Sequence, residues 1–90
     1  MNYQQLTKLQ KEAGHYQYQQ LINSGDVWHM EGSAGRYAIE LIEAGACMLS
    51  TKVKQDFWGN WIPSRYLVKQ GTKGSFKHCV NYYNNLINNE

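Results

Sequence analysis

Apolar residues recur at spacings of three and four positions over residues 3–23, and this period predicts a helix. Glycine costs about 1 kcal/mol inside a helix, so Ala13-Gly14 is expected to break or kink it. Ser24-Gly25-Asp26 supplies a stop signal at its C-terminal end. The first quarter of the chain is therefore expected to be helical with one interruption.

Two further helices are predicted downstream. Residues 33–44 place apolar side chains on one face, and Ser33 and Gly45 are the expected N-cap and end of that helix. The last helix is expected to follow Ser75 as its N-cap and to run to about residue 88. The apolar stripe of the second helix comprises Ala34, Tyr37, Ala38, Leu41 and Ile42, and that of the last comprises Phe76, Cys79, Val80, Tyr83, Leu86 and Ile87.

The middle of the chain favours extended structure. Residues 51–68 carry β-branched and aromatic residues on both sides of Gly59-Asn60, which predicts a β-hairpin or two short strands around that turn. Pro63 ends the second strand or confines it to an edge, and the apolar run Cys47-Met48-Leu49 is a further candidate strand. These elements together predict a small α+β fold, a single domain over 1–90, with about three helices packed around a short antiparallel β-hairpin.

Composition and charge indicate the size of the hydrophobic core and the kind of partner the chain could bind. The chain has 90 residues, which allows one modest core, and its three Trp, seven Tyr and two Phe are expected to carry much of it. The net charge of +2 is unevenly distributed, because residues 1–45 carry −2 and residues 46–90 carry +4. A basic half favours an anionic partner such as nucleic acid or an acidic protein face, although its cations also suit ordinary solvation.

Cysteine and histidine show no spacing typical of metal binding or catalysis. Cys47 and Cys79 lie in apolar context without CxxC, which indicates buried free thiols in a reducing compartment. The histidines are scattered, and the neighbours His78 and Cys79 point about 100° apart on a helix. We therefore expect a non-enzymatic protein with no metal and no cofactor. Because the chain has no signal-peptide pattern and no long apolar run, we also expect a cytoplasmic protein without a membrane segment.

Two glycine-rich turns are candidates for anion binding. Gly32-Ser33-Ala34-Gly35 opens a helix, whose first N–H groups favour anions, and Arg36 follows as a bidentate phosphate ligand. The alternative is a tight turn with an N-cap. Gly71-Thr72-Lys73-Gly74 has the spacing of the GxxG loop with which KH domains clamp nucleic acid. The order of the predicted elements does not match a KH domain, however, and a solvated turn that carries Lys73 is the favoured interpretation.

Aromatic and cationic residues are concentrated between residues 56 and 66. Such residues stack on bases, and they are also the types found at protein-interface hot spots. Because side chains alternate along a strand, we expect Trp58 to be exposed and Phe57 and Trp61 to pack in the core. The predicted partner-binding residues are Trp58, Arg65, Lys69, Lys73 and Arg36. The alternative, a nucleic-acid surface, would use Lys52, Lys54, Arg65, Lys73 and Lys77.

Three segments of the chain carry a resemblance to a known group of proteins. They are Met30-Glu-Gly-Ser-Ala-Gly-Arg36, Asp56-Phe-Trp-Gly-Asn-Trp-Ile-Pro-Ser-Arg65 and Gly71-Thr-Lys-Gly-Ser75. They resemble short bacteriophage and prophage proteins with the pattern EGSxGRxA, DxxGNxIPSR and GTKGS, which usually have Tyr-Tyr-Gly-Asn where this chain has Phe57-Trp58-Gly59-Asn60. The resemblance implies a mobile-element accessory protein in a bacterial host cell, and it brings no assigned activity.

An origin in a mobile element favours some of the candidate functions over others. We expect a protein that binds stoichiometrically to a host protein or protein–nucleic-acid complex, an anti-CRISPR-like counter-defence inhibitor being one form of it. The alternative is direct nucleic-acid binding through the basic C-terminal half. A homo-oligomeric phage component is the third hypothesis.

Overall fold

The computed structural model describes residues 1–89, and over that range it contains four α-helices, one 3₁₀-helix and one two-stranded sheet. In chain order these are α1 (Tyr3–Ala13), α2 (Tyr16–Ser24), η1 (Asp26–His29), α3 (Gly32–Ala44), β1 (Lys54–Gln55), β2 (Trp61–Ile62) and α4 (Phe76–Asn88). The predicted α+β class is confirmed. None of the helices in this range is long and apolar enough to cross a membrane.

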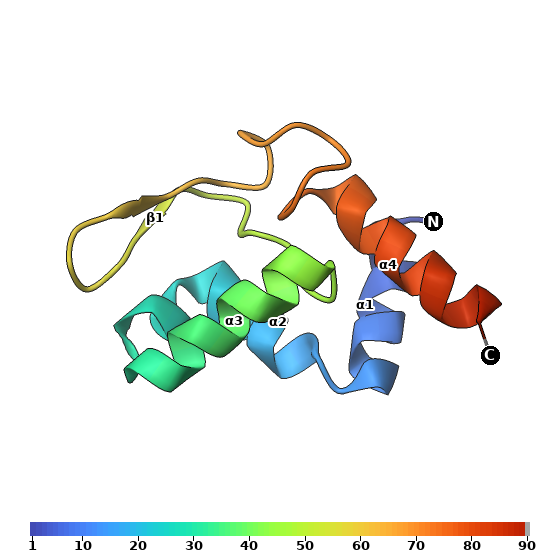
Figure 1. Ribbon diagram of the computed structural model, residues 1–90, viewed down its shortest axis with the longest axis horizontal. Helices are drawn as coiled ribbons and strands as arrows, with labels where there is room; N and C mark the ends of the chain where they lie inside the picture. The colour runs from blue at the N-terminus through green and yellow to red at the C-terminus, as the bar shows by residue number, and fades with distance from the viewer. Residues whose placement is uncertain (90) are drawn as a thin grey trace.

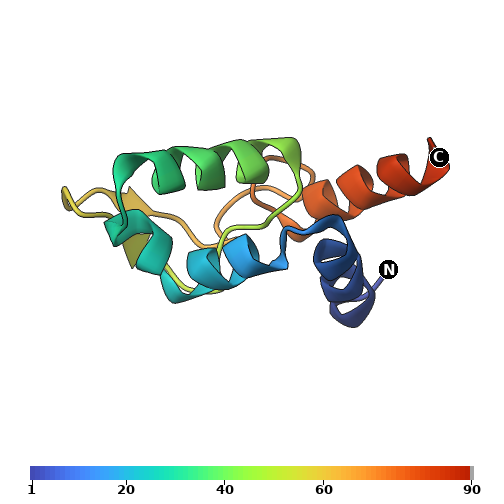
Figure 2. The same ribbon diagram turned by 90° about the horizontal axis from the view of Figure 1, so that it is seen from below.

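The molecule is elongated, with principal extents of 40 × 25 × 19 Å. The hairpin of β1 and β2 lies at one end, α1 and α4 form the opposite end, and α2 and α3 lie between them (Figures 1 and 2). The strands pair antiparallel through Lys54 with Ile62 and Gln55 with Trp61. The hairpin is therefore shorter than the predicted 51–68, and it projects from one end instead of lying among the helices.

Local capping sets most helix ends. Gly14, in the left-handed conformation, ends α1, so the predicted first helix is two helices and the total is four instead of about three. Gly45 ends α3 and the Ser75 hydroxyl caps α4 by accepting from His78 N at 3.1 Å, both as predicted. The prediction for Ser33 is wrong: α3 begins one residue earlier with Glu31 as its N-cap, and the Ser33 hydroxyl donates to the Glu31 carboxylate.

The core consists of two clusters, in which aliphatic residues outnumber aromatic ones. The larger lies between η1, α2, α3 and the segment that follows α3, and the smaller lies between α1 and α4. Trp28 and Tyr83 are the aromatic side chains buried in these clusters. The large share of the core expected for aromatics is therefore not found among the described residues. The larger cluster contains Ile22, Val27, Trp28, Ala34, Ala38, Leu41, Ile42, Ala46, Cys47 and Leu49, and the smaller contains Leu6, Met48, Cys79 and Tyr83.

The segment 46–50 is fully buried but is not a strand, which corrects the prediction for Cys47-Met48-Leu49. Its backbone is hydrogen-bonded largely by side chains that come from four other parts of the chain. Gln10 and Tyr83 donate to Ala46 O at 3.2 and 2.9 Å. Gln19 both donates to Met48 O and accepts from Met48 N, and Arg65 donates to Leu49 O. These four side chains, Gln10, Gln19, Arg65 and Tyr83, are called the polar network below.

Candidate functional site

Three large aromatic side chains are exposed on the hairpin. Trp58 is 78% exposed, as predicted, but Phe57 and Trp61 are 72% and 71% exposed, which contradicts their expected core placement. Phe57 and Trp58 belong to the turn, where strand alternation does not apply, and Trp61 faces solvent while its neighbour Ile62 packs against the larger core cluster. Phe57, Trp58 and Trp61 are called the aromatic patch.

The hairpin is attached to the body through η1. His29 Nε2 donates to Gln55 O at 2.9 Å, and Phe57 N donates to Trp28 O at 3.3 Å. The Lys54 stem also packs on Gly25, where a Cβ would lie 3.0 Å from Lys54 Cδ, and the φ of 85° at Gly25 favours glycine. The three contacts fix the direction in which the patch projects.

The turn itself is organised by the Asp56 carboxylate. It accepts hydrogen bonds from Trp58 N at 2.9 Å and from Asn60 N at 2.8 Å, and it also contacts the Asn60 side-chain amide. Gln55 Nε2 closes the loop by donating to Gly59 O at 2.9 Å. The aromatic rings are therefore carried on a hydrogen-bonded loop, which reduces the entropy that a partner would have to remove on binding.

These hydrogen bonds also change the ionisation of Asp56. Partial desolvation acts to raise its pKa, but the hydrogen bonds from Asn60, Trp58 and Gly59 together outweigh it, so the pKa lies below its usual value of 3.8. The carboxylate that holds the loop is accordingly an anion at neutral pH.

A hollow of about 200 Å³ lies beside Trp58. Its apolar lining includes Val27, Trp28 and Ile39, and its charged lining includes Glu31 and Arg36. Two of the segments singled out in the sequence meet here, because Glu31 and Arg36 belong to the first and Trp58 to the second. The sequence did not identify Ile39 or Trp28 as site residues, since neither belongs to a polar or glycine-rich motif. Among the described residues, Trp28 Nε1 is the one buried side-chain nitrogen without a hydrogen-bond partner.

Arg65 is not available to a partner, and its predicted role is corrected. It is only 5% exposed, its Nε donates to Leu49 O at 2.8 Å, and its Nη2 donates to Asn23 Oδ1 at 3.2 Å. Arg65 N also donates to Ser50 O. The residue is a structural support for the buried segment 46–50, because five donors in a fixed fork can satisfy several backbone and amide oxygens at once.

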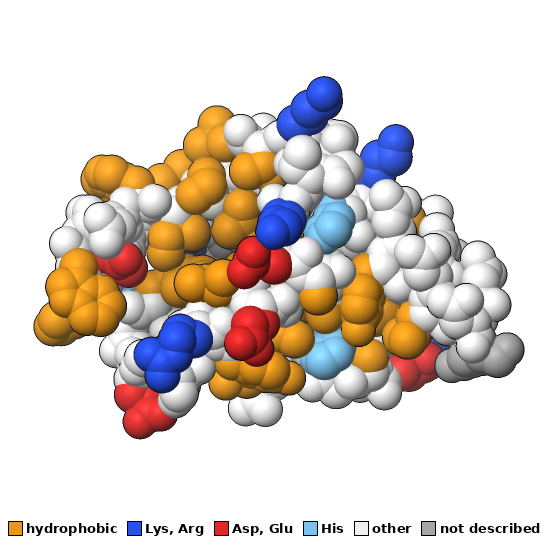
Figure 3. Space-filling view, viewed as in Figure 1, with side chains coloured by type: hydrophobic (Ala, Val, Ile, Leu, Met, Phe, Trp, Pro, Cys, Tyr) orange, Lys and Arg blue, Asp and Glu red, His pale blue; other side chains and the backbone are white. Residues whose placement is uncertain are grey.

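The remaining predicted cations lie at or near the surface. Lys52, Lys69, Lys77 and Arg36 are exposed, whereas Lys54 is half-buried. On the face seen in Figure 3 the Lys and Arg side chains stand singly, and hydrophobic side chains gather towards the hairpin end. This face therefore presents apolar surface more continuously than positive charge.

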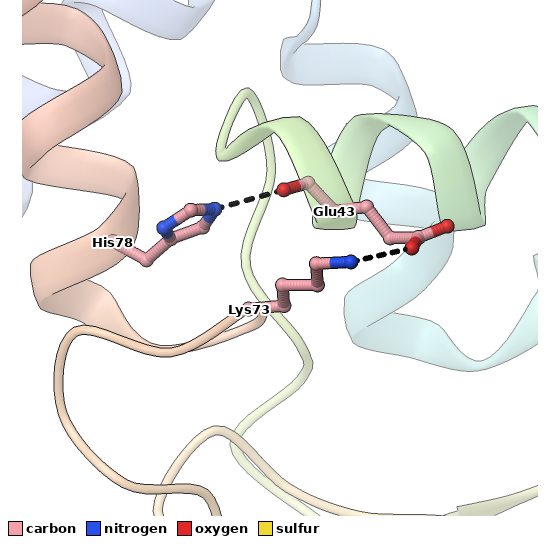
Figure 4. Close-up of polar contacts among 3 residues, drawn as sticks. All are labelled: Glu43, Lys73 and His78. Atoms are coloured by element: carbon pink, nitrogen blue, oxygen red, sulfur yellow. Dashed lines mark hydrogen bonds and ion pairs between the residues drawn. The ribbon is translucent and has the colours of Figure 1, made fainter.

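Lys73 already has a partner within the protein. Its Nζ lies 2.9 Å from Glu43 Oε2, and His78 Nε2 donates to the Glu43 carbonyl at 2.9 Å (Figure 4). Both contacts join α3 to the chain around the start of α4. An exposed ion pair of this kind contributes about 0–1 kcal/mol, but it lowers the local positive charge that a nucleic acid would meet.

The turn Gly71-Thr72-Lys73-Gly74 is packed at one end. Gly74 is buried, and a Cβ there would lie 2.5 Å from Leu49 Cδ1. Leu49 N donates to Gly74 O at 3.1 Å, and Gly71 N donates to Ser75 Oγ at 3.0 Å. Close packing against Leu49 therefore requires glycine at position 74. Neither of the two interpretations of this turn, a nucleic-acid clamp or a solvated turn, predicted that packing.

The thiols are buried as the sequence indicated, and two histidines have structural hydrogen bonds. Cys47 and Cys79 are buried and free, and desolvation by burial is the main cause that raises the pKa of each to about 12. His29 and His78 each bond a backbone carbonyl. Residues 1–89 contain no group of three or more His, Cys, Asp or Glu side chains arranged to hold a metal ion.

Comparison with known proteins adds no relative. No protein-family model matches the chain, and no curated protein or solved structure is significantly similar to it.

Proposed function

We propose that this protein is a non-enzymatic binding module that acts by stoichiometric attachment to a host protein or protein–nucleic-acid complex, and that the aromatic patch is its recognition surface. A bacteriophage or mobile-element setting follows from the resemblance of its three motifs, and a counter-defence inhibitor of the anti-CRISPR kind is the specific form we propose. The observation that carries the proposal is the exposure of Phe57, Trp58 and Trp61 on a hydrogen-bonded loop.

Two physical arguments support this use of the patch. Phe57 and Trp58 pack edge to face at 5.5 Å, and exposed aromatic surface on a small protein is often functional, because leaving it in water is unfavourable. Tryptophan is also among the residues that dominate protein interfaces, and a rigid loop that presents it avoids much of the ordering cost. Arg36 and Lys69, both exposed, remain proposed contacts at the margin of such an interface.

The test is recovery of a defined complex by the full chain. Tagged protein should retain a host complex in near-equimolar amount from a bacterial lysate, and Trp58→Ser should reduce its affinity about 30-fold or more. Leu86→Ser is the matched control, because Leu86 is a comparably apolar, exposed residue on α4 at the other end of the molecule. Equal recovery by wild type and Trp58→Ser would refute the patch as the recognition surface.

Direct binding of single-stranded nucleic acid is the second candidate, and one observation favours it. The exposed rings lie in the same hairpin as Lys54, with exposed Lys52 just before β1, and base–aromatic stacking contributes about 1–3 kcal/mol per base. Two of the five predicted cations are nevertheless engaged, Arg65 inside the protein and Lys73 with Glu43. A labelled oligonucleotide should then bind at low salt and weaken with a slope of about −0.7 per phosphate contact; no binding at low salt would remove this candidate.

A further inference from the structure

The surface formed by Phe57, Trp58 and the neighbouring hollow contains features that are complementary in shape and in charge. Protruding rings, Phe57 and Trp58, packed edge to face at 5.5 Å, stand next to the hollow of about 200 Å³. The lining of that hollow also contains a carboxylate, that of Glu31, and a guanidinium, that of Arg36. In a twofold-symmetric interface residue i meets residue j of the other copy and j meets i, so a surface that holds both a ring and a hollow, and both an acid and a base, can pair with itself.

We propose that this face binds the same face of a second copy of the chain, so that the free protein is a twofold-symmetric dimer. The protruding rings of each copy enter the hollow of the other, and Arg36 of each meets Glu31 of the other. The dimer does not depend on the proposed function, but its consequence does: where the aromatic patch is the recognition surface, dimer formation and host binding compete for it.

The available apolar area fits a dimer. A standard interface covers about 800 Å² on each partner. A buried Phe or Trp contributes about 150–250 Å², so the exposed fractions of Phe57 and Trp58, 72% and 78%, supply roughly a third of that area. Met30 and Ile39 line the hollow and are both nearly half exposed, which extends the apolar surface beyond the patch.

The charges around the hollow favour a second copy over a strongly charged partner. Glu31 and Asp56 would repel an acidic surface, and Arg36, which folds over Gly32 with its Nη1 3.2 Å from where a Cβ would lie, would repel a basic one. A second copy presents both a negative and a positive charge, and twofold symmetry brings the Arg36 of one copy to the Glu31 of the other. Pairing of the chain with itself therefore places Arg36 of each copy opposite Glu31 of the other, so that these two charges meet the opposite sign.

Sedimentation equilibrium of the full chain tests the proposal. We expect a mass of twice 10.4 kDa at high protein concentration that falls towards 10.4 kDa on dilution. Trp58→Ser should raise the dissociation constant of the dimer about 100-fold, because the substituted residue occurs twice in a twofold-symmetric interface. Leu86→Ser should leave it unchanged. A wild-type mass of 10.4 kDa at every concentration, or an unaffected dimer in Trp58→Ser, would overturn the proposal.

A charge exchange then tests the geometry. Glu31→Arg and Arg36→Glu should each be monomeric alone, because each opposes like charges across the axis, and an equimolar mixture should form the dimer. Both positions are exposed, so circular dichroism should show unchanged folding. A mixture that stays monomeric contradicts the proposed pairing. A monomeric wild type that still captures a host complex would refute the dimer alone, whereas a dimer with no host partner would refute only the proposed function.

Discussion

The hairpin exposes apolar side chains to solvent, whereas the polar network buries polar ones. At the hairpin, two tryptophans and a phenylalanine face solvent, although they are among the most apolar residues of the chain. At the polar network, Arg65, Gln10 and Gln19 are almost completely buried, although a solvated position would leave their polar groups hydrated. The exposed rings are apolar, whereas several of the side chains buried around segment 46–50 are polar.

The difference shows that hydrogen bonding, as well as hydrophobicity, decides which side chains are inside. The segment 46–50 is buried without being a strand, and an unpaired buried carbonyl costs about 1–3 kcal/mol. Polar side chains that supply the missing donors are therefore drawn inside with it. The hairpin has no such demand, because its short ladder and the Asp56 carboxylate satisfy its own loop, and its rings remain free to project.

Removing the Arg65 side chain is the largest disturbance we expect. Arg65→Ala leaves Leu49 O without its donor and opens a cavity, so the free energy of unfolding should fall by about 3 kcal/mol. For a chain of this size the melting temperature should then fall by more than about 10 °C, as measured by circular dichroism. Lys69→Ala, which removes an exposed cation, is the control and should change it little. Equal melting temperatures for both variants would contradict the structural role of Arg65.

Gln19→Leu should have the next largest effect. It keeps a side chain of similar size but removes both the acceptor for Met48 N at 2.7 Å and the donor to Met48 O at 3.0 Å. Two buried backbone groups lose their partners, and we expect about 2 kcal/mol of destabilisation in urea unfolding. Gln20→Leu, at an exposed position of α2, should stay within about 0.5 kcal/mol of wild type, and a comparable loss there would show that helix propensity, not the network, is responsible.

Substitution at the aromatic patch should be nearly neutral for stability. Because Trp61 is 71% exposed, Trp61→Ser should change the free energy of unfolding by no more than about 0.5 kcal/mol in the same urea experiment. The contrast with Gln19→Leu would sharpen the comparison, since the more apolar residue would matter less to folding. A loss above about 2 kcal/mol would mean that the ring supports the core.

The smallest effect we expect is confined to the hairpin turn. The lowered pKa of Asp56 means that its loop hydrogen bonds are fully present above the usual value of 3.8 and are lost as the pH falls through the lower folded value. The amide signals of Trp58 and Asn60, followed by NMR, should titrate with a midpoint below 3.8 while the rest of the spectrum remains native. Asp56→Asn should abolish this transition, and a midpoint above 3.8 in the wild type would contradict the hydrogen-bonded loop.

Sequence reasoning succeeded where the determining contacts are local. Gly14, Gly45 and Ser75 set helix ends through contacts within a few residues, and the turn around Gly59 was predicted on the same basis. The placement of Arg65 depends on Leu49 and Asn23, which are 16 and 42 residues away in the chain. No local pattern reports such contacts.

The candidate site was predicted in part for the same reason. Strand alternation predicted the exposure of Trp58 correctly, although Trp58 lies in the turn. It failed for Phe57 and Trp61, because the alternation was extended over strands that prove to be two residues each. The hollow joins α3 to the hairpin turn, so its lining from Glu31 to Trp58 is assembled only by the tertiary fold.

The buried segment 46–50 also has a consequence for how the protein folds. The side chains that pair its carbonyls come from α1, α2, the chain after β2 and α4, at sequence separations of up to 37 residues. Closing these loops costs chain entropy before the segment gains its hydrogen bonds, so we expect the segment to become ordered late in folding. During synthesis the chain therefore reaches its native state only after residues through Tyr83 have left the ribosome.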